Sequence, residues 1–151
     1  MQILEGFTEE IEIYSIDEAF LKVPERIIQN GKADDWGREI LKKVKQWTGI
    51  PVSVGIAPTK TLAKIANEWA KVERRRNDVT DLSELNDVAL NEILKKIPVG
   101  EIWGIGRNRQ AHLKKFGIYS ALDFKNADRR WIRKSLSVQG ERTQLEIKGI
   151  L

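Results

Sequence analysis

The chain is organised around Ile11-Glu12-Ile13-Tyr14-Ser15-Ile16-Asp17-Glu18-Ala19-Phe20-Leu21, where two β-prone runs meet at a pair of neighbouring acids. The pattern predicts two short strands on either side of Asp17 and Glu18. Two carboxylates at a strand end suit a hard cation such as Mg²⁺, which takes oxygen ligands and keeps water or substrate phosphates in its shell. Taken alone, neighbouring acids are more typical of solvated surface charge, so the rest of the chain decides between these interpretations.

Composition narrows the class of protein and of site. The chain has 151 residues, 41% hydrophobic and 32% charged, which is typical of one globular domain or two small ones. No apolar run approaches the roughly 20 residues that span a bilayer, and the acidic start is unlike a signal peptide, so we expect a cytoplasmic location. The chain has no cysteine and a single histidine, His112, which excludes a thiolate zinc site and a histidine cluster. Any metal must therefore be bound by carboxylates.

Charge is unevenly distributed along the chain. The net charge is +4, with acids dominating up to Asp35 and bases dominating from Arg38 to Arg76 and from Lys95 to Lys148. Lysines and arginines that neutralise phosphates give salt-sensitive affinity for nucleic acid. The pattern indicates that the chain binds a cation at its acidic end and a polyanion along its basic remainder, although an ordinary basic protein has a similar composition.

Helix and strand alternate after the acidic pair. An amphipathic helix is predicted from an N-cap at Asp34 or Asp35 up to Gly49, and we expect its apolar stripe in the core. A strand at residues 51–56 and a helix at residues 59–71, capped by Thr59, follow. The helix at 59–71 has one apolar face and one polar stripe, a pattern that fits either a solvated face or contact with a triphosphate. The first stripe consists of Trp36, Ile40, Val44 and Trp47, and the polar stripe of Lys60, Lys64, Asn67 and Lys71.

Turn-forming residues between 77 and 87 predict a boundary, after which helices at 88–97 and 107–116 are expected. Between them lies Pro98-Val99-Gly100-Glu101-Ile102-Trp103-Gly104-Ile105-Gly106. Glycines allow close approach of the backbone, and the amides at the start of the following helix suit a phosphate. The third glycine of a dinucleotide fingerprint is missing. We therefore interpret the segment as a helix-hairpin-helix with a site for one nucleic-acid phosphate.

These segments together resemble the Y-family translesion DNA polymerases, most closely the UmuC group. Tyr14-Ser15-Ile16-Asp17-Glu18-Ala19-Phe20 is similar to the palm motif of the family. Val54-Gly55-Ile56-Ala57-Pro58-Thr59-Lys60-Thr61-Leu62-Ala63-Lys64-Ile65-Ala66-Asn67 is similar to its strand-to-helix segment. Val99-Gly100-Glu101-Ile102-Trp103-Gly104-Ile105-Gly106-Arg107 resembles the thumb hairpin, and Gly140-Glu141-Arg142-Thr143 with Ile147-Lys148-Gly149 resembles the end of the thumb.

The resemblance implies an α+β fold. Residues 1–77 would form a partial palm of short antiparallel strands with two helices, and residues 78–151 a small all-α thumb with the helix-hairpin-helix. Asp17 and Glu18 would be two of the three catalytic carboxylates that hold a pair of Mg²⁺ ions. Lys71, and more weakly Lys60, would bind the triphosphate. The hairpin would hold the DNA duplex by its backbone, without reading sequence, through Gly104, Ile105, Gly106 and Arg107.

The function implied is templated nucleotidyl transfer in error-prone translesion synthesis, as part of SOS DNA repair and damage tolerance. The implied substrates are primer-template DNA and deoxynucleoside triphosphates (dNTPs), and the implied partners are UmuD-type accessory subunits, a recombinase filament and a sliding clamp, with no membrane. The first catalytic Asp, the fingers, the first palm strand, the little finger and the clamp-binding tail of the family are absent from this sequence, which is therefore interpreted as an internal fragment. With two carboxylates only, we expect no primer extension by this polypeptide alone.

Other classes remain open on the residues. A non-catalytic, sequence-independent DNA-binding module would use only the helix-hairpin-helix, and a structural remnant would use neither site. A nucleotide cyclase shares palm-like topology and two-metal chemistry but does not account for the segment from Val99 to Arg107.

The aromatic residues are divided between core and surface by their context. Trp36, Trp47 and Trp69 fit apolar helix faces and are expected in the core. Trp103 and Trp131 are candidates for contact with DNA, although each is expected to pack against protein rather than to stack on a base. His112 is expected to be solvated.

Overall fold

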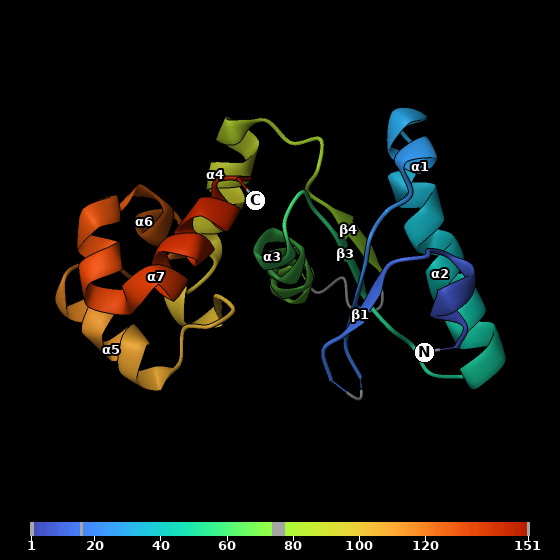
Figure 1. Ribbon diagram of the computed structural model, residues 1–151, viewed down its shortest axis with the longest axis horizontal. Coiled ribbons are helices and arrows are strands. Elements are labelled where there is room, and N and C mark those ends of the chain that lie inside the picture. The colour runs from blue at the N-terminus through green and yellow to red at the C-terminus, as the bar shows by residue number, and fades with distance from the viewer. Residues whose placement is uncertain (1, 16, 74–77, 151) are drawn as a thin grey trace.

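A computed structural model describes residues 2–15, 17–73 and 78–150 of the chain (Figure 1). Its first part combines strands and helices and its second part is helical, so the expected α+β class is confirmed. Helix α3 (Lys60–Val72) lies between the two parts (Figure 1). Within the described ranges, none of the helices is long and apolar enough to cross a bilayer.

The first part contains two short pairs of strands. Strand β1 (Ile11–Ile13) pairs antiparallel with β2 (Ala19–Leu21), with Ile11 opposite Leu21, as expected for strands that flank the acidic residues. Strand β3 (Val54–Ile56) pairs in parallel with β4 (Val79–Asp81). A short 3-10 helix, η1 (Leu4–Gly6), and helix α1 (Glu25–Gln29) flank the β1–β2 pair in sequence.

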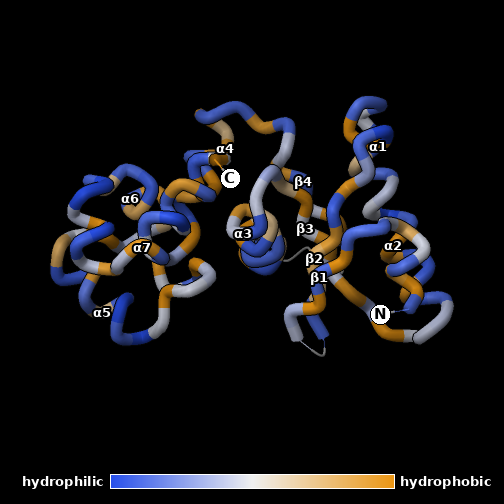
Figure 2. The backbone as a smooth tube through the Cα atoms, in the orientation of Figure 1, coloured by the Kyte–Doolittle hydropathy of each residue, from blue (hydrophilic) through white to orange (hydrophobic). Residues whose placement is uncertain are grey.

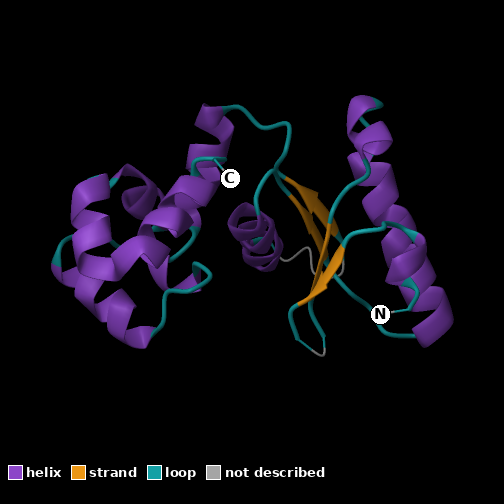
Figure 3. Cartoon of the chain, in the orientation of Figure 1, coloured by secondary structure: helices purple, strands orange, loops and turns teal. Residues whose placement is uncertain are grey.

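Helices α2 (Ala33–Thr48) and α3 cover opposite sides of the β3–β4 pair (Figure 3). Two glycines permit this close packing. A Cβ atom at Gly37 in α2 would lie 3.1 Å from a methyl carbon of Val79, and one at Gly55 in β3 would lie 2.3 Å from the carbonyl oxygen of Ala63 in α3. Larger residues at these positions would push the helices away from the strands.

The second part consists of four helices and a 3-10 turn. The elements are α4 (Asp87–Lys96), η2 (Val99–Glu101), α5 (Arg107–Lys115), α6 (Ala121–Asn126) and α7 (Arg129–Ile147). Helix α7 contains a kink at Ser137, which has φ 69° and ψ −172°. The expected helices at 88–97 and 107–116 are thus confirmed to within one residue at each end, and α6 and α7 complete the bundle.

Helix α3 contributes one face to the core of the helical part. Its apolar residues Leu62, Ile65 and Ala66 belong to the same cluster as Leu94 and Phe124 of the helical part. In Figure 2 hydrophobic and hydrophilic stretches alternate along the helices of this part, as expected of helices with one buried face. Polar bonds reinforce this packing, since the Thr59 hydroxyl donates to the Glu146 carbonyl at 2.8 Å and the Thr61 hydroxyl donates to the Glu146 carboxylate at 2.9 Å. Helices α3 and α7 are therefore joined by apolar and polar contacts.

Thr59 caps α3 as predicted, accepting a hydrogen bond from the Leu62 amide, whereas the start of α2 differs from the prediction. Lys32, not Asp34 or Asp35, occupies its N-cap, without a side-chain cap bond, and both acids lie in the first turn. In the first turn, their negative charges interact favourably with the positive end of the helix dipole, and no capping bond is needed.

The expected position of Trp47 in the core is wrong, whereas Trp36 is buried and Trp69 packs against the core. Trp47 is 73% exposed although it follows the stripe of Trp36 and Ile40. A helix the length of α2 spans about 24 Å, but three-residue strands span only about 10 Å. The last turns of α2 therefore have no strand beneath them.

Strand β4 is a feature that the sequence pattern did not predict. It lies within residues 78–151, the range assigned to the thumb, yet it pairs with β3 of the first part. The segment is short and lies among turn-forming residues, so its pairing with β3 outweighs its local propensity. The division of the chain at residues 77 and 78 stays a prediction, and strand pairing would place the end of the first part after Asp81.

A buried amide in α7 generates a prediction for stability. The Gln144 side chain is fully buried, and its Nε2 donates to the carbonyl oxygens of Phe124 at 3.1 Å and Ala127 at 2.7 Å, at the end of α6. Gln144→Leu should lower the free energy of unfolding by about 2 kcal/mol, because the Ala127 carbonyl would lose this donor and the Phe124 carbonyl would keep only its bond from the Ala127 amide. Urea denaturation measures this loss. Gln139→Leu on the exposed side of α7 is the matched control and should change stability by less than about 0.5 kcal/mol; equal losses would contradict the assignment.

The buried carboxylate of Glu141 generates a prediction for pH dependence. A hydrogen bond from Arg129, at 2.9 Å from its Nε, and the charges of Arg129 and Arg133 lower the pKa of Glu141 below its ordinary value of 4.5. Because the folded-state pKa is depressed, this stabilisation is present above pH 4.5 and is lost as pH falls through the folded pKa. The difference in unfolding free energy between the wild type and Glu141→Gln should therefore be constant near neutral pH and shrink below pH 4.5. A difference that stays the same in acid, measured by denaturation across pH, would overturn this prediction.

Candidate functional site

The turn between β1 and β2 presents two carboxylates to solvent. The amides of Tyr14 and Ser15 both donate to the Glu18 carbonyl at 3.1 Å, which closes the turn. Asp17 and Glu18 are exposed, and the Ser15 hydroxyl donates to Asp17 Oδ1 at 2.8 Å. We call Asp17 and Glu18 the acidic corner; Ile16, which lies between Ser15 and Asp17 in the motif, falls outside the described residues.

Lys64 is the basic side chain that contacts the acidic corner. Its Nζ lies 3.4 Å from both carboxylate oxygens of Glu18. The same ammonium lies over two aromatic rings, 5.2 Å from the centroid of Tyr14 and 5.7 Å from that of Trp103. Sequence reasoning placed Lys64 on the polar stripe of α3 but gave it no role, since helical spacing does not reveal which lysine meets the acids.

The two lysines expected to bind nucleotide have other neighbours. Lys60 forms an ion pair with Glu12 in β1 and lies 5.5 Å from the Phe20 ring centroid. Lys71 pairs with Glu68 on its own helix at 3.0 Å. These exposed pairs contribute little to stability, so either lysine is available to an incoming anion. Their role in nucleotide binding stays a prediction.

The acidic corner fits a divalent cation only in part. Two exposed carboxylates supply the oxygen donors that Mg²⁺ prefers, and Mg²⁺ commonly uses one or two carboxylates together with water and phosphates. Within the described residues, however, no group of three or more His, Cys, Asp or Glu residues is placed to hold a metal ion. Glu18 is also already neutralised by Lys64.

The segment between α4 and α5 forms the expected hairpin, and residues 102–106 are its loop. Gly104 has φ +91°, a backbone conformation that favours glycine. Gly106 is the N-cap of α5 and makes no side-chain cap bond. A Cβ atom at either glycine would meet no atom within 4 Å, so the backbone is open on this side.

The four predicted DNA-binding residues are not equivalent. Ile105 is 6% exposed and packs in the core, and its amide donates to the Ile102 carbonyl at 3.0 Å, so neither its side chain nor its amide is open to a ligand. Arg107 is exposed at the first position of α5, where free amides and the helix dipole favour an anion. Another arginine, Arg109, folds back on the loop, with its guanidinium 3.4 Å from the Gly104 carbonyl oxygen. The loop thus offers open backbone amides next to positive charge.

The two tryptophans considered for DNA contact differ in their surroundings. Trp103 packs against Tyr14 and Phe20, with ring centroids 5.3 Å apart in both cases. Trp131 stacks on His112, with centroids 5.9 Å apart and nearly parallel planes. The expectation that each packs against protein is confirmed, whereas His112 is half-buried rather than fully solvated, because α5 and α7 bring it onto Trp131.

Comparisons with known proteins agree with this geometry. The impB/mucB/samB family model matches residues 1–68, and the model of the IMS family HHH motif matches residues 87–118, which include α4, the loop and α5. Protein UmuC of Salmonella typhimurium is 42% identical over 151 residues, covering 99% of this chain and 35% of that protein. DNA polymerase IV 1 of Halalkalibacterium halodurans is 30% identical over 148 residues, covering 98% of this chain and 34% of that protein.

A solved structure shares the arrangement of the elements. The structure described as "Insertion ternary complex of Dbh DNA polymerase" superposes with a TM-score of 0.72 at 26% identity, covering 97% of this chain and 41% of that one. The chain spans about a third of the length of the curated relatives that it matches, 35% and 34% in the two cases above. By its two family matches, its similarity to UmuC and its shared fold, the chain belongs to the Y-family (IMS/UmuC/DinB) of DNA polymerases.

Proposed function

We propose that the chain supplies part of the palm and the thumb of an error-prone translesion DNA polymerase that performs templated nucleotidyl transfer. One observation carries the proposal: the hairpin loop touches the turn that bears the acidic corner, with the Trp103 indole nitrogen 3.1 Å from the Tyr14 hydroxyl oxygen. A polymerase must hold the primer duplex beside the site that activates the primer end and the triphosphate. A phosphate-binding loop next to a pair of carboxylates meets that requirement.

The residues of this chain would divide the work. Mg²⁺, when bound, would neutralise charge on the triphosphate and lower the pKa of the primer 3′-hydroxyl. Asp17 and Glu18 would supply two carboxylates to that ion, and Lys71 and Lys60 would contact the triphosphate. The amides at Gly104, Gly106 and Arg107 would hold one DNA phosphate without reading sequence.

Lys64 must release Glu18 before both carboxylates can bind a cation. The Glu18 pair is half-exposed, so it is weak and readily exchanged for a divalent ion. Until then Lys64 neutralises one acid of a pair that would otherwise repel itself. This occupancy and the lack of a third carboxylate in the described ranges support the proposal that the polypeptide alone does not extend primers.

Primer-template DNA and dNTPs are the partners that this function requires. UmuD-type accessory subunits, a recombinase filament and a sliding clamp remain expectations from the resemblance. The second candidate function is a non-catalytic DNA-binding module. It is favoured by the hairpin, because both helices and the loop are present, whereas the described residues place only two carboxylates at the corner.

The open backbone at Gly106 provides a test of DNA binding. Gly106→Val adds a side chain that meets no protein atom within 4 Å but occupies the space in front of the amides. Affinity for duplex DNA, measured by fluorescence anisotropy at low salt, should fall about tenfold, equivalent to about 1.4 kcal/mol.

The matched control is Gly6→Val, which also introduces valine at an unhindered glycine, remote in sequence from the hairpin. It should leave DNA affinity unchanged. Equal effects of the two substitutions, or none from Gly106→Val, would exclude the hairpin as the DNA-binding site.

A primer-extension assay tests the catalytic proposal. With Mg²⁺, primer-template and dNTPs, the 151-residue chain should give no templated incorporation, because two carboxylates hold the ion too weakly. Asp17→Ala should give the same baseline and should leave duplex affinity unchanged. Incorporation by the wild type that Asp17→Ala abolishes would show instead that the chain is a sufficient catalyst.

A further inference from the structure

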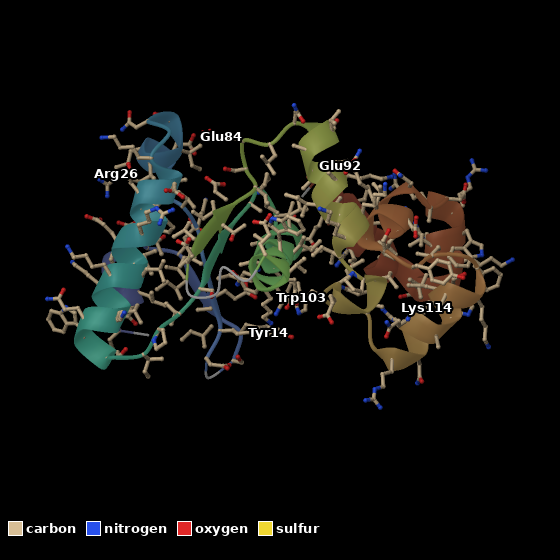
Figure 4. All side chains as sticks on the ribbon, turned by 180° about the vertical axis from the view of Figure 1, so that it is seen from behind. Tyr14, Arg26, Glu84, Glu92, Trp103 and Lys114 are labelled. Atoms are coloured by element: carbon tan, nitrogen blue, oxygen red, sulfur yellow. The ribbon has the colours of Figure 1, made fainter. Side chains whose placement is uncertain are left out.

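An aromatic contact joins two segments that lie far apart in the sequence. The Trp103 indole N–H donates to the Tyr14 hydroxyl at 3.1 Å across 89 residues, and the two rings meet edge to face at 86°. Figure 4 shows the two labelled side chains next to each other, between the helical part and the strands. Trp103 belongs to the hairpin loop, and Tyr14 belongs to the turn that carries the acidic corner.

Lys64 adds a cation to this contact. Its ammonium lies over the rings of both Tyr14 and Trp103, at 5.2 and 5.7 Å, while it also pairs with Glu18 at 3.4 Å. Its side chain is 26% exposed, so its attractions to the two rings are less screened than those of a fully solvated lysine. One side chain of α3 therefore contacts the acidic corner and the hairpin loop together. We call Tyr14, Lys64 and Trp103 the junction.

Apart from the contact of Trp103 with the Phe20 ring, the described residues show no other hydrogen bond or ring contact between the loop and the strands. Ile102 and Ile105, on either side of Trp103 and Gly104, are buried in the core of the helical part. They fix the loop to the helical bundle but not to the strands. Trp103 points the other way, toward β1 and β2, so the junction sets where the loop lies relative to the acidic corner.

We propose that Lys64, Tyr14 and Trp103 are positioning residues that hold the phosphate-binding loop in place beside the acidic corner. The inference rests on the proposed function, in which the loop binds DNA. It assigns a role in DNA affinity to Tyr14 and Lys64, although neither belongs to the hairpin. The junction lets the loop bind a phosphate without first being ordered, which lowers the entropic cost of binding.

Hydrogen exchange without DNA tests the positioning directly. The probes are the Trp103 indole N–H and the Ile105 amide, which donates to the Ile102 carbonyl at 3.0 Å. Tyr14→Phe removes only the hydroxyl acceptor, and Lys64→Met removes only the charge. Each should speed exchange at the indole by about threefold or more, with a smaller effect at Ile105, and Lys64→Arg should restore the wild-type rate.

Lys43→Met is the matched control. Lys43 in α2 also lies over an aromatic ring, that of Phe7 at 5.4 Å, so its loss removes one charge and one cation–π contact away from the junction. Exchange at Trp103 and Ile105 should not change in this variant. Equal rates in Lys64→Met and the wild type would overturn the proposal.

Duplex affinity of the same variants completes the test. Tyr14→Phe and Lys64→Met should weaken binding about threefold to tenfold, with Lys43→Met near wild type and Lys64→Arg rescuing the loss. Faster exchange without any loss of affinity would overturn the role in DNA binding.

A failure of the proposed function can be distinguished from a failure of the junction proposal. If the wild-type chain does not bind duplex DNA, the DNA-binding proposal fails, and the exchange rates alone decide whether the junction positions the loop.

Discussion

Helix α3 is the element on which the other contacts depend, because its two faces meet different partners. Its apolar face lies in the shared core with Leu94 and Phe124, and Gly55 lets the same helix approach β3 closely. Two lysines of its polar stripe reach the β1–β2 pair, where Lys60 pairs with Glu12 in β1 and Lys64 with Glu18 in the turn. A helix that buries one face and presents cations on the other can contact both the helical part and the acidic corner.

The electrostatics of the acidic corner follow from this arrangement. Two adjacent carboxylates repel each other, and the lysine of a neighbouring helix relieves part of that repulsion. The pair is exposed enough that it contributes little to stability. One of the two negative charges of the corner is thus neutralised, and both carboxylates remain accessible to a metal ion. The same lysine extends over Tyr14 and Trp103, so the charge of the corner and the position of the hairpin loop share one group.

In the hairpin loop, some residues pack against the bundle and others leave the backbone open for binding. Ile102 and Ile105 are buried, so they hold the loop to the bundle, while Gly104 and Gly106 leave its backbone open to solvent. At Gly100, a Cβ atom would lie 2.5 Å from the end of the Gln110 side chain, which is flexible and can move aside. Backbone access at Gly104 and Gly106 is therefore the clearer role of glycine in this motif.

Much of the fold was predictable because its signals are local. The Thr59 cap, the helices near 59–71, 88–97 and 107–116, and the strands around the acidic residues follow from caps, periodicity and turn residues. Trp47 and β4 were not predictable in this way. The exposure of Trp47 depends on where the strands beneath α2 end, and β4 depends on pairing with β3.

The sequence by itself determined which residue types each element contains and showed that the motifs occur in the order found in the family. It placed the carboxylates at a turn, the lysines on one helical stripe and the glycines between two helices. Only the tertiary structure decided that Lys64, not Lys60 or Lys71, meets Glu18 across 46 residues, and that Trp103 meets Tyr14 across 89. Periodicity states which residues share a face of one element, but the partner of that face is set by how the elements pack.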